Sequence, residues 1–492
     1  MSKKVIELLR KYGPMLSGEL ARFFEREYKV SNEAARKALS RANEPVKKIY
    51  TLSFDKNQKF FYLKDQFMSE VYTDRLLEAI KENSQINWMY ICAFNAQGGY
   101  VSKEILPAFV SAPIKNVKGH KLHERIIADL LKCQIIEELD ETHWKLCDWV
   151  SGSTRNLSRS FGIESVKKQV INDFAMWARN INLIAYNSAK TLVDKAEFAN
   201  FQWGFTAPCY VQPIFDLSTQ KNGFVVADVF YGKRADVADV KYFIDKVTIV
   251  RNFKKIQNFM PVFISESATP EAQALLKEHK ILIAYIKSIF DEKYTELLAE
   301  IVHVFTCASA IIINNPEKIE KLFMELSKAE GRYNDIIGDL FELMVGYYFQ
   351  QVGCNYLQIK KNIRIPNSSN TNELDVLTIK DGTVIVAECK ATRAPVDDKY
   401  VERWLSKNIP QIREWLKEEY SDRYKVEFQL WSLGGFTTKA LKMLQQAQEN
   451  VRKYSIRFFE KESIMRMVKE VGNQTLIDML NQHFEPVTNK VK

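Results

Sequence analysis

Two β-rich segments joined by a tight turn, in the C-terminal half of the chain, constrain its fold most. Residues 384–387 read Val-Ile-Val-Ala, which is apolar on both faces and typical of a central strand covered on either side. Residues 372–379 before it alternate between polar and apolar side chains, and the Asp-Gly turn between the segments predicts a β-hairpin. The buried strand runs directly into the charged sequence Glu-Cys-Lys at residues 388–390.

Charged side chains at the end of the hairpin away from the turn predict a cation site. Glu388 and Lys390 share one face of their strand because side chains alternate along a strand, and Asp375 lies on the partner strand. Charges that continue a buried strand are costly unless they converge on a cation, and Mg²⁺ prefers carboxylate and carbonyl oxygens. We therefore expect Asp375, Glu388 and the backbone carbonyl of Cys389 to bind Mg²⁺, with Mn²⁺ able to replace it. A surface ladder of salt bridges is the alternative.

The pattern Asp-x12-Glu-x-Lys, preceded by a helix that carries Glu342, resembles the PD-(D/E)xK nuclease superfamily, also called restriction-endonuclease-like. Apolar residues at helical spacing over residues 335–349 predict that helix. The most similar subtype is that of Holliday-junction resolvases and methyl-directed restriction nucleases, which also place a glutamate on the first helix. Leu374 occupies the position before the aspartate, where the motif has proline. Glu373 is an alternative metal ligand.

The resemblance implies a fold and an activity for residues 316–492. The fold would be a three-layer α/β/α domain, which suits the order αβββαβ of the expected elements, and the activity would be metal-dependent hydrolysis of phosphodiester bonds. Besides the ligands named above, Glu342 would bind the metal through water or hold a second ion. Lys390 would orient the attacking water or neutralise the scissile phosphate. Gln411, on the helix after the Glu-x-Lys strand, would approach the site.

The pattern of residues 1–68 predicts a winged helix-turn-helix domain. Its helical segments are residues 3–12, 17–28 and 31–41, and two β-rich segments, residues 49–54 and 59–63, flank a polar turn. Three short helices followed by a hairpin resemble this fold, whose third helix enters the major groove of DNA. Residues 1–66 hold 15 Lys and Arg against 8 Asp and Glu, an excess that favours a polyanionic partner.

The candidate DNA contacts are outward-facing residues of the third helix and of the wing: Asn32, Arg36, Lys37, Ser40, Arg41, Lys56 and Lys59. A protein–protein module is the alternative interpretation of this segment. Residues 69–150 resemble a second winged-helix domain. Its first helix is expected at residues 86–94, its second begins at Ser102 as a cap, and its third is expected at residues 118–133. On the last of these helices, the residues expected to face outward are His120, Lys121, His123 and Arg125.

Residues 160–314 predict an α/β domain that repeats the element order of the C-terminal domain. The expected elements are helices at residues 166–180, 237–253 and 269–279 and strands at residues 210–216, 224–230, 261–264 and 281–285. Asp216, Asp228 and Phe230 would take the places of the aspartate, glutamate and lysine of the later site. Because phenylalanine cannot stabilise phosphate charge, we interpret this segment as a degenerate nuclease-like domain. An unrelated α/β domain is the alternative.

Composition limits the remaining function classes. No apolar run reaches the roughly 18 residues of a membrane span. The seven cysteines are scattered without a Cys-x-x-Cys spacing, which favours the reducing cytoplasm over a disulfide framework or a zinc site. We therefore expect a multidomain α+β and α/β protein without a membrane partner.

The expected function follows from combining these segments. It is a cytoplasmic, Mg²⁺-dependent deoxyribonuclease, of the type II restriction-endonuclease kind, that binds double-stranded DNA. A role in restriction or anti-phage defence follows by analogy alone. With one site per chain, cutting both strands implies a homodimer or two successive nicks. The alternatives are a non-catalytic DNA-binding regulator with nuclease-like scaffold domains, and an RNA nuclease.

Overall fold

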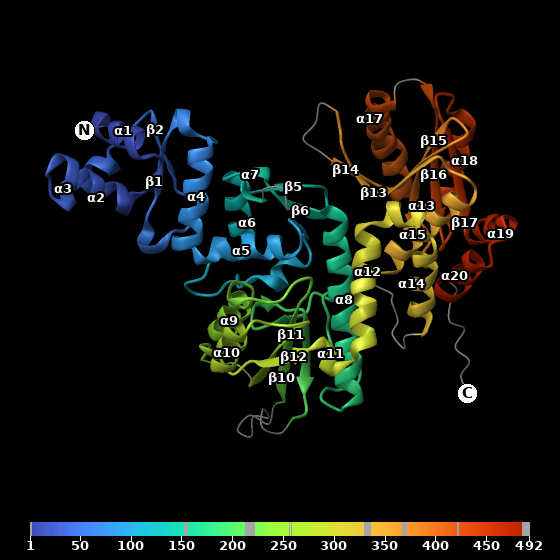
Figure 1. Cartoon of the computed structure of the whole chain (residues 1–492), viewed down its shortest axis with the longest axis horizontal. Helices are drawn as coiled ribbons and strands as arrows, with labels where there is room; N and C mark the ends of the chain where they lie inside the picture. Colours follow the sequence, from blue (N-terminus) through green and yellow to red (C-terminus); the bar gives the residue numbers. More distant parts are fainter. Residues whose placement is uncertain are drawn as a thin grey trace. The chain divides into compact units, whose positions relative to one another are not determined.

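The chain folds into two compact units (Figure 1). The computed structural model describes residues 2–151, 156–211, 222–254, 256, 258–328, 336–366, 371–420 and 423–484. Unit 1 comprises Met1–Ser160 and Val170–Ile289, and unit 2 comprises Phe161–Gln169 and Phe290–Lys492. Helix α8 (Leu157–Asn180) therefore contributes to both units.

The helices were compared with the length and apolarity that a membrane span requires. No single helix in the described ranges meets both conditions. Helices α12 (Glu292–Thr306) and α13 (Ala308–Asn314) meet them only as a pair, and this pair is bent by 90°.

Unit 1 begins with helices and a small antiparallel sheet. The elements are α1 (Ser2–Tyr12), β1 (Met15–Leu16), α2 (Ser17–Tyr28), α3 (Asn32–Ser40), β2 (Val46–Ile49), the 3-10 turn η1 (Asp55–Asn57), β3 (Phe60–Leu63) and the 3-10 turn η2 (Lys64–Gln66). The strand order is β1-β3-β2. Leu20, Phe24 and Leu39 pack in the core between the helices. Ser31 caps α3, because its side chain accepts a hydrogen bond from the Ala34 backbone N–H.

The three helices predicted in this segment are confirmed, but the first strand of the predicted hairpin is wrong. It spans Val46–Ile49 rather than residues 49–54. The reason is that Val46 and Ile49 are buried and pair with Leu63 and Phe60 of β3. The next residue, Tyr50, is 63% exposed.

The second part of unit 1 also combines helices with a three-stranded sheet. The elements are α4 (Glu70–Asn83), α5 (Gln85–Ala96), β4 (Tyr100–Ser102), the 3-10 turn η3 (Leu106–Phe109), α6 (His123–Lys132), β5 (Ile136–Glu138), β6 (His143–Leu146) and α7 (Asp148–Ser151). The strand order, β4-β6-β5, repeats that of the first sheet. The helix predicted after Ser102 is wrong, because residues 100–102 pair with β6 and only η3 follows them.

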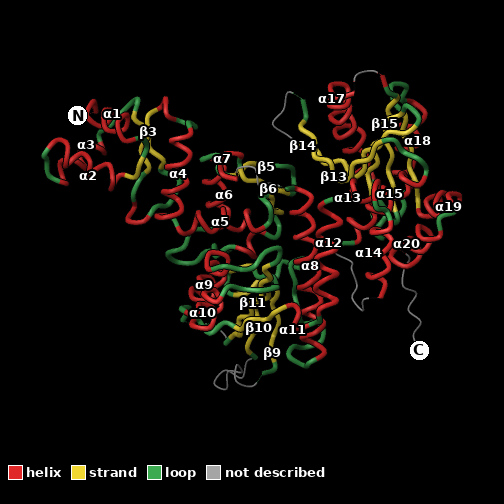
Figure 2. The backbone as a smooth tube through the Cα atoms, in the orientation of Figure 1, coloured by secondary structure: helices red, strands yellow, loops and turns green. Residues whose placement is uncertain are grey.

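The third part of unit 1 is a four-stranded sheet with helices around it (Figure 2). Its elements are β7 (Glu197–Phe198), β8 (Phe201–Gln202), β9 (Phe205–Cys209), β10 (Gly223–Phe230), α9 (Val237–Arg251), β11 (Phe259–Ser265), α10 (Pro270–Glu278), β12 (Leu282–Tyr285) and α11 (Ile286–Ile289). The strand order is β12-β11-β10-β9; β9 is antiparallel to β10 and the other pairs are parallel. The strand that pairs antiparallel with β10 is β9; residues 212–216 of the strand predicted at residues 210–216, with Asp216, lie outside the described residues.

Unit 2 is built around a five-stranded mixed sheet in the order β13-β14-β15-β16-β17. After α12 and α13, the elements are α14 (Glu317–Lys328), α15 (Ile337–Gln351), β13 (Tyr356–Arg364), β14 (Thr371–Lys380), β15 (Thr383–Lys390), α16 (Asp398–Arg403), the π-helical turn η5 (Trp404–Asn408), α17 (Ile409–Tyr420), β16 (Lys425–Ser432), α18 (Thr438–Asn450), β17 (Ser455–Glu460), α19 (Lys461–Val471) and α20 (Gln474–Phe484). Strands β13 to β15 pair antiparallel, and β15 to β17 pair in parallel.

Helices lie on both faces of this sheet. On one face, Trp431 of β16 packs its ring against Tyr348 and Phe349 of α15. On the other face, Trp404 belongs to an apolar core that also contains Val386 and Phe428. The predicted hairpin is confirmed as β14 and β15. The helix break predicted near Pro410 is η5, which ends at Asn408, two residues before this proline, which has no N–H to donate.

Candidate active site

The aspartate, glutamate and lysine of the hairpin lie together in unit 2. Asp375 stands one residue beyond the last pair of the β14–β15 ladder, so it lies opposite Glu388. The Oδ2 atom of Asp375 accepts a hydrogen bond of 2.7 Å from the Cys389 backbone N–H. The Lys390 ammonium donates to Glu388 Oε1 at 2.7 Å. The structure therefore makes neighbours of the three side chains that the pattern singles out.

Helix α16 adds Tyr400, which the sequence does not indicate. The Tyr400 hydroxyl donates to Glu388 Oε1, the same oxygen that accepts from Lys390. The Lys390 ammonium lies 5.1 Å from the centroid of the Tyr400 ring. Asp397 caps α16 by accepting a hydrogen bond of 2.8 Å from the Tyr400 backbone N–H. Glu388 is consequently held from two directions, by a lysine of its own strand and by a tyrosine of the next helix.

A second buried cluster adjoins Asp375 on the side of β13. Lys360 has a left-handed backbone, with φ of 52°, and lies opposite Asp375 in the β13–β14 register. Its ammonium forms an ion pair with Asp339 and lies 3.6 Å from Glu342 Oε2. Ser165 Oγ donates to Asp339 Oδ2 at 2.5 Å. Lys360 thus holds the first-helix glutamate, Glu342, beside the hairpin.

Negative charge is in excess around this site. Asp375, Asp339 and Glu373 act on the ionisation of Glu342, and Glu388 and Glu373 act on that of Asp375. The cations that act on these groups are Lys360, Lys390 and Arg403. Burial, followed by the charge of Glu388, raises the pKa of Asp375 to about 7. Burial also raises the pKa of Glu342 well above its ordinary value.

The lysine and the glutamate of the pair shift in opposite directions. Burial alone would raise the pKa of Glu388, but Lys390 and the Tyr400 hydroxyl outweigh it, so the pKa is lowered. Burial alone would lower the pKa of Lys390, but the carboxylates of Glu388 and Asp375 raise it well above its ordinary value. At neutral pH this pair is therefore an ammonium beside a carboxylate.

The donor set fits a divalent cation. Glu342 Oε2 is buried and has no hydrogen-bond partner among the described residues. Burial, together with neighbouring carboxylates, raises the pKa values of Asp375 and Glu342, and a bound cation would oppose both shifts. Within the described ranges, no three His, Cys, Asp or Glu side chains stand close enough together to hold a metal as they lie. A metal would therefore rest on Asp375 and Glu388 together with backbone and water oxygens.

Gln411 is the predicted site residue that the structure does not bring into contact with the others. It lies half-buried in the first turn of α17. In the part of the chain that the structure describes, it makes no hydrogen bond to Asp375, Glu388 or Lys390. The contact with Glu388 comes instead from Tyr400, one helical segment earlier.

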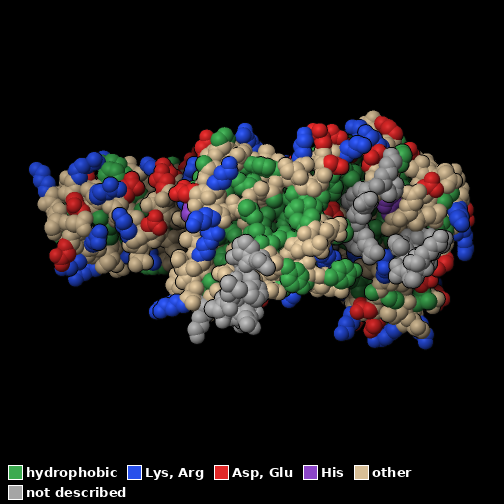
Figure 3. Space-filling view, turned by 90° about the horizontal axis from the view of Figure 1, so that it is seen from below, with side chains coloured by type: hydrophobic (Ala, Val, Ile, Leu, Met, Phe, Trp, Pro, Cys, Tyr) green, Lys and Arg blue, Asp and Glu red, His purple; other side chains and the backbone are tan. Residues whose placement is uncertain are grey.

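The candidate DNA contacts lie on an exposed surface of unit 1. Exposed side chains are Asn32, Arg36, Lys37 and Ser40 of α3, Arg41 at its C-cap and Lys56 of η1, and Lys59 is half-buried. Lys37 forms an ion pair of 2.7 Å with Glu33. Figure 3 shows Lys and Arg side chains spread among acidic ones over this N-terminal segment, at the left of the view.

The outward orientation predicted for His123 is wrong. The residue is 6% exposed, and its Nδ1 atom lies 2.7 Å from the Tyr90 hydroxyl of α5. Burial lowers the pKa of His123 to about 4, so the imidazole is neutral at pH 7. A buried neutral ring cannot contact phosphate. His120 and Arg125 are exposed, and Lys121 is half-buried.

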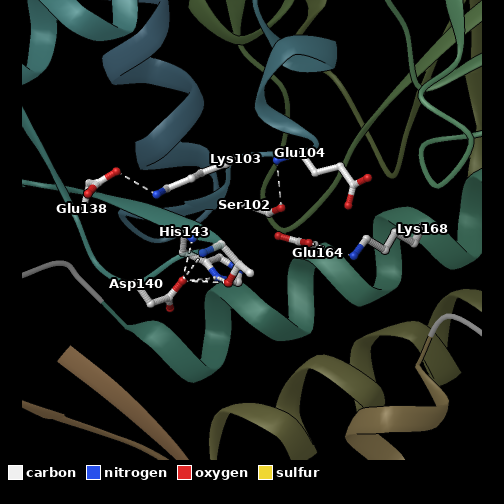
Figure 4. A network of polar contacts seen from close by, with 9 residues as sticks. Ser102, Lys103, Glu104, Glu138, Asp140, His143, Glu164 and Lys168 are labelled. Carbon is white, nitrogen blue, oxygen red and sulfur yellow. Dashed lines mark hydrogen bonds and ion pairs between the residues drawn. The ribbon is translucent and has the colours of Figure 1, made fainter. Parts of the chain in front are cut away.

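A polar network holds the turn between β5 and β6 (Figure 4). Asp140 Oδ1 accepts backbone hydrogen bonds from Thr142 at 2.6 Å and His143 at 2.7 Å, and Lys103 pairs with Glu138 at 2.8 Å. Burial would raise the pKa of Asp140, but the hydrogen bonds from His143 and Thr142 lower it to about 2. These groups satisfy one another locally, so we assign the network a structural role.

Comparison with solved structures finds distant structural neighbours, of which three are described here. No protein-family model matches the chain, and no curated protein is significantly similar to it in sequence. A crystal structure of a protein of unknown function is 15% identical, with a TM-score of 0.20, over 26% of this chain and 64% of that one. A repair endonuclease from Pyrococcus abyssi is 21% identical, with a TM-score of 0.15, over 24% of this chain and 44% of that one.

The third neighbour, restriction endonuclease FokI, is 12% identical, with a TM-score of 0.19, over 93% of this chain and 83% of that one. The chain thus spans less than two thirds of the first two neighbours. Two of the three are endonucleases. TM-scores this low do not establish a common fold, so the function has to rest on the geometry of the site.

Proposed function

We propose that the chain is a metal-dependent DNA endonuclease whose C-terminal domain is of the PD-(D/E)xK kind. The observation that carries this proposal is the meeting of Asp375, Glu388 and Lys390 at the end of a buried hairpin. Surface ion pairs would be solvated, whereas the side chains of Glu388 and Lys390 are only 16% and 28% exposed. A half-buried cluster of carboxylates and ammonium groups is a costly arrangement for stability alone, which favours a catalytic role.

Each site residue has a role in this proposal. A bound Mg²⁺ or Mn²⁺ would acidify a water molecule and stabilise the charge that develops on the phosphate. Asp375, Glu388 and the Cys389 backbone carbonyl would hold the ion, and Glu342 would bind it through water. Lys390, which the neighbouring carboxylates keep protonated, would present its ammonium to the attacking water or to the scissile phosphate.

The N-terminal segments would supply DNA binding. Helices followed by a sheet in the order β1-β3-β2, repeated as β4-β6-β5, suit two winged helices. The exposed residues of α3, Arg36 and Lys37 among them, would then enter the major groove of duplex DNA. With one site per chain, cutting both strands would need a homodimer or two successive nicks. A role in restriction or anti-phage defence in the cytoplasm extends the proposal by analogy.

Incubation of the full chain with supercoiled plasmid, single-stranded DNA and RNA tests the proposal, with Mg²⁺, Mn²⁺ or EDTA. Asp375→Ala and Lys390→Met should each slow single-turnover DNA cleavage by about 100-fold or more, because the first removes a ligand of the ion and the second removes the ammonium presented to the reacting phosphate. Asp381→Asn and Lys380→Met change the same residue types at the opposite end of the hairpin. These two control variants should cleave like the wild type.

The outcomes separate the competing functions. Cleavage that survives both Asp375→Ala and Lys390→Met would show that the chemistry lies elsewhere. Failure of the wild type to cut any polymer with either metal would favour a DNA-binding regulator with nuclease-like scaffold domains. Cleavage of RNA alone would make the chain an RNA nuclease.

A further inference from the structure

The four-stranded sheet of unit 1 and the five-stranded sheet of unit 2 have the same connections. In each, an antiparallel pair, β9 and β10 or β14 and β15, is followed by two parallel strands, and each of these comes after a helix. Strands β10 and β15 are both 8 residues long. Their last residues, Phe230 and Lys390, pair with serines, Ser265 and Ser432, at the ends of β11 and β16.

The turns after these strands agree as well. In each unit, the loop after the central strand (β10 or β15) forms a parallel β-bridge with the loop after the neighbouring parallel strand (β11 or β16). The residue after each end of this bridge caps the helix that follows, an aspartate in the first loop and a threonine in the second. The bridges are Ala235 to Ala268 and Val396 to Phe436, and the caps are Asp236 and Thr269 in unit 1 and Asp397 and Thr437 in unit 2. The connections, the bridges and the caps therefore agree between the two sheets.

The site positions of the core have changed in unit 1. Counted from the start of the strand, Asp228 and Phe230 stand where unit 2 has its glutamate and lysine. The β9–β10 register, continued by one residue, places Gly204 rather than Asp216 where unit 2 has its aspartate. The Gly204 N–H donates to Asp228 Oδ1 at 2.6 Å, and a side chain there would meet a backbone carbonyl oxygen at 3.0 Å. The opposite strand therefore offers Asp228 no second carboxylate.

A lysine occupies the side of Asp228 on which a cation would bind. Lys246 of α9 and Asp228 are both 0% exposed, and Lys246 Nζ lies 2.8 Å from Asp228 Oδ2. The ammonium also donates to the carbonyl oxygens of Ala108 at 2.6 Å and of Gln202 at 3.0 Å. Its three N–H donors thus meet one carboxylate and two carbonyl oxygens, which satisfies the charged form. The same set of oxygens is what a hard divalent cation prefers.

We propose that the third part of unit 1 is a second copy of the nuclease-like core in which the Lys246 ammonium has taken the place of the metal ion. The copy is therefore not hydrolytic. Instead it fixes the second part of unit 1 to the sheet through the Ala108 carbonyl of η3. That the unit 2 core binds a metal rests on the proposed function. The match between the two sheets and the contacts of Lys246 are independent of that function.

Removal of the ammonium tests whether it stands where a metal would bind. Lys246→Ala is made in the full chain that also carries Asp375→Ala, so that the candidate site of unit 2 does not contribute. Loss of one partner of a buried pair should lower the thermal midpoint by roughly 6–20 °C. Mn²⁺ in tenfold excess over its Kd should then raise the midpoint by about 3 °C. The further change Asp228→Asn should abolish this rise.

A matched control and a second readout complete the test. Lys241→Ala removes an exposed lysine from the same helix and should leave the midpoint and its response to Mn²⁺ unchanged. If Lys246→Ala does not stay folded, the yield of soluble chain recovered from urea is measured with Mn²⁺ and with EDTA. A higher yield with Mn²⁺ only while Asp228 is present supports the proposal.

If Mn²⁺ raises the thermal midpoint or the refolding yield equally with and without Asp228, or in neither variant, the proposal that Lys246 replaces a metal ion is overturned. Failure of the proposed nuclease function would appear in the plasmid assay and would leave this comparison unchanged.

Discussion

Replacement of Tyr400 by phenylalanine probes the site without changing any of its charged residues. The Tyr400 hydroxyl and Lys390 donate to the same Glu388 oxygen, so the variant removes one of the two donors and keeps the ring. A hydrogen bond to a charged group contributes about 1.5–3 kcal/mol. This corresponds to about 10- to 150-fold in a rate or an equilibrium constant. We expect Tyr400→Phe to lower the single-turnover cleavage rate, and to raise the Mn²⁺ concentration for half-maximal rate, by a combined factor in this range.

Tyr347→Phe is the matched control. The Tyr347 hydroxyl also donates to a glutamate, Glu320, and the residue is 1% exposed, but it belongs to none of the clusters around Asp375. Urea unfolding should show a comparable loss of stability in both variants, whereas only Tyr400→Phe should slow cleavage. Cleavage by Tyr400→Phe within twofold of the wild type at every Mn²⁺ concentration would refute the role of Tyr400 in holding Glu388.

Three further predictions concern stability and binding. Burial lowers the pKa of His123 to about 4 from 6.5, so between these values the unfolded chain binds a proton that the folded chain does not. Acidification from pH 7 to pH 5 should therefore destabilise the wild type by about 2 kcal/mol more than it destabilises His123→Gln in urea unfolding, whereas His120→Gln should respond like the wild type. Lys360→Met, which leaves Asp339 and Glu342 without their cation, should lower the unfolding free energy by about 3–5 kcal/mol, and a change under 0.5 kcal/mol would contradict the ion pairing. Arg36→Ala with Lys37→Ala should weaken DNA binding and reduce the slope of log affinity against log salt by roughly 2, and an unchanged slope would exclude α3 from the interface.

The hairpin and its charged end could be predicted because both are local features. Strand β15 is apolar on both faces up to Ala387, and an Asp-Gly turn joins it to the alternating β14, so pattern and turn chemistry agree. Asp375 and Glu388 become neighbours through this pairing alone. The same holds for α3, where a serine cap and helical spacing coincide.

The rest of the site could not be predicted, since it depends on packing between distant segments. Tyr400 reaches Glu388 only because α16 folds back over the sheet, 12 residues further along the chain. Lys360 interrupts the alternation of β13 and has a left-handed backbone, which no local pattern indicates for a lysine. The wrong prediction that His123 faces outward has the same origin. The Tyr90 hydroxyl that contacts the His123 ring lies on a helix, 33 residues away in sequence.

The two copies of the core solve the same electrostatic problem differently. A carboxylate at the end of a buried central strand needs a positive charge. In unit 1, Lys246 supplies that charge to Asp228, and its three oxygen contacts leave its ammonium no further donor. In unit 2, burial and the charge of Glu388 raise the pKa of Asp375 to about 7, although Lys390 lies close enough to oppose the shift. Because Lys246 already neutralises Asp228, we expect one hydrolytic site per chain, in unit 2, and nicked plasmid before linear plasmid.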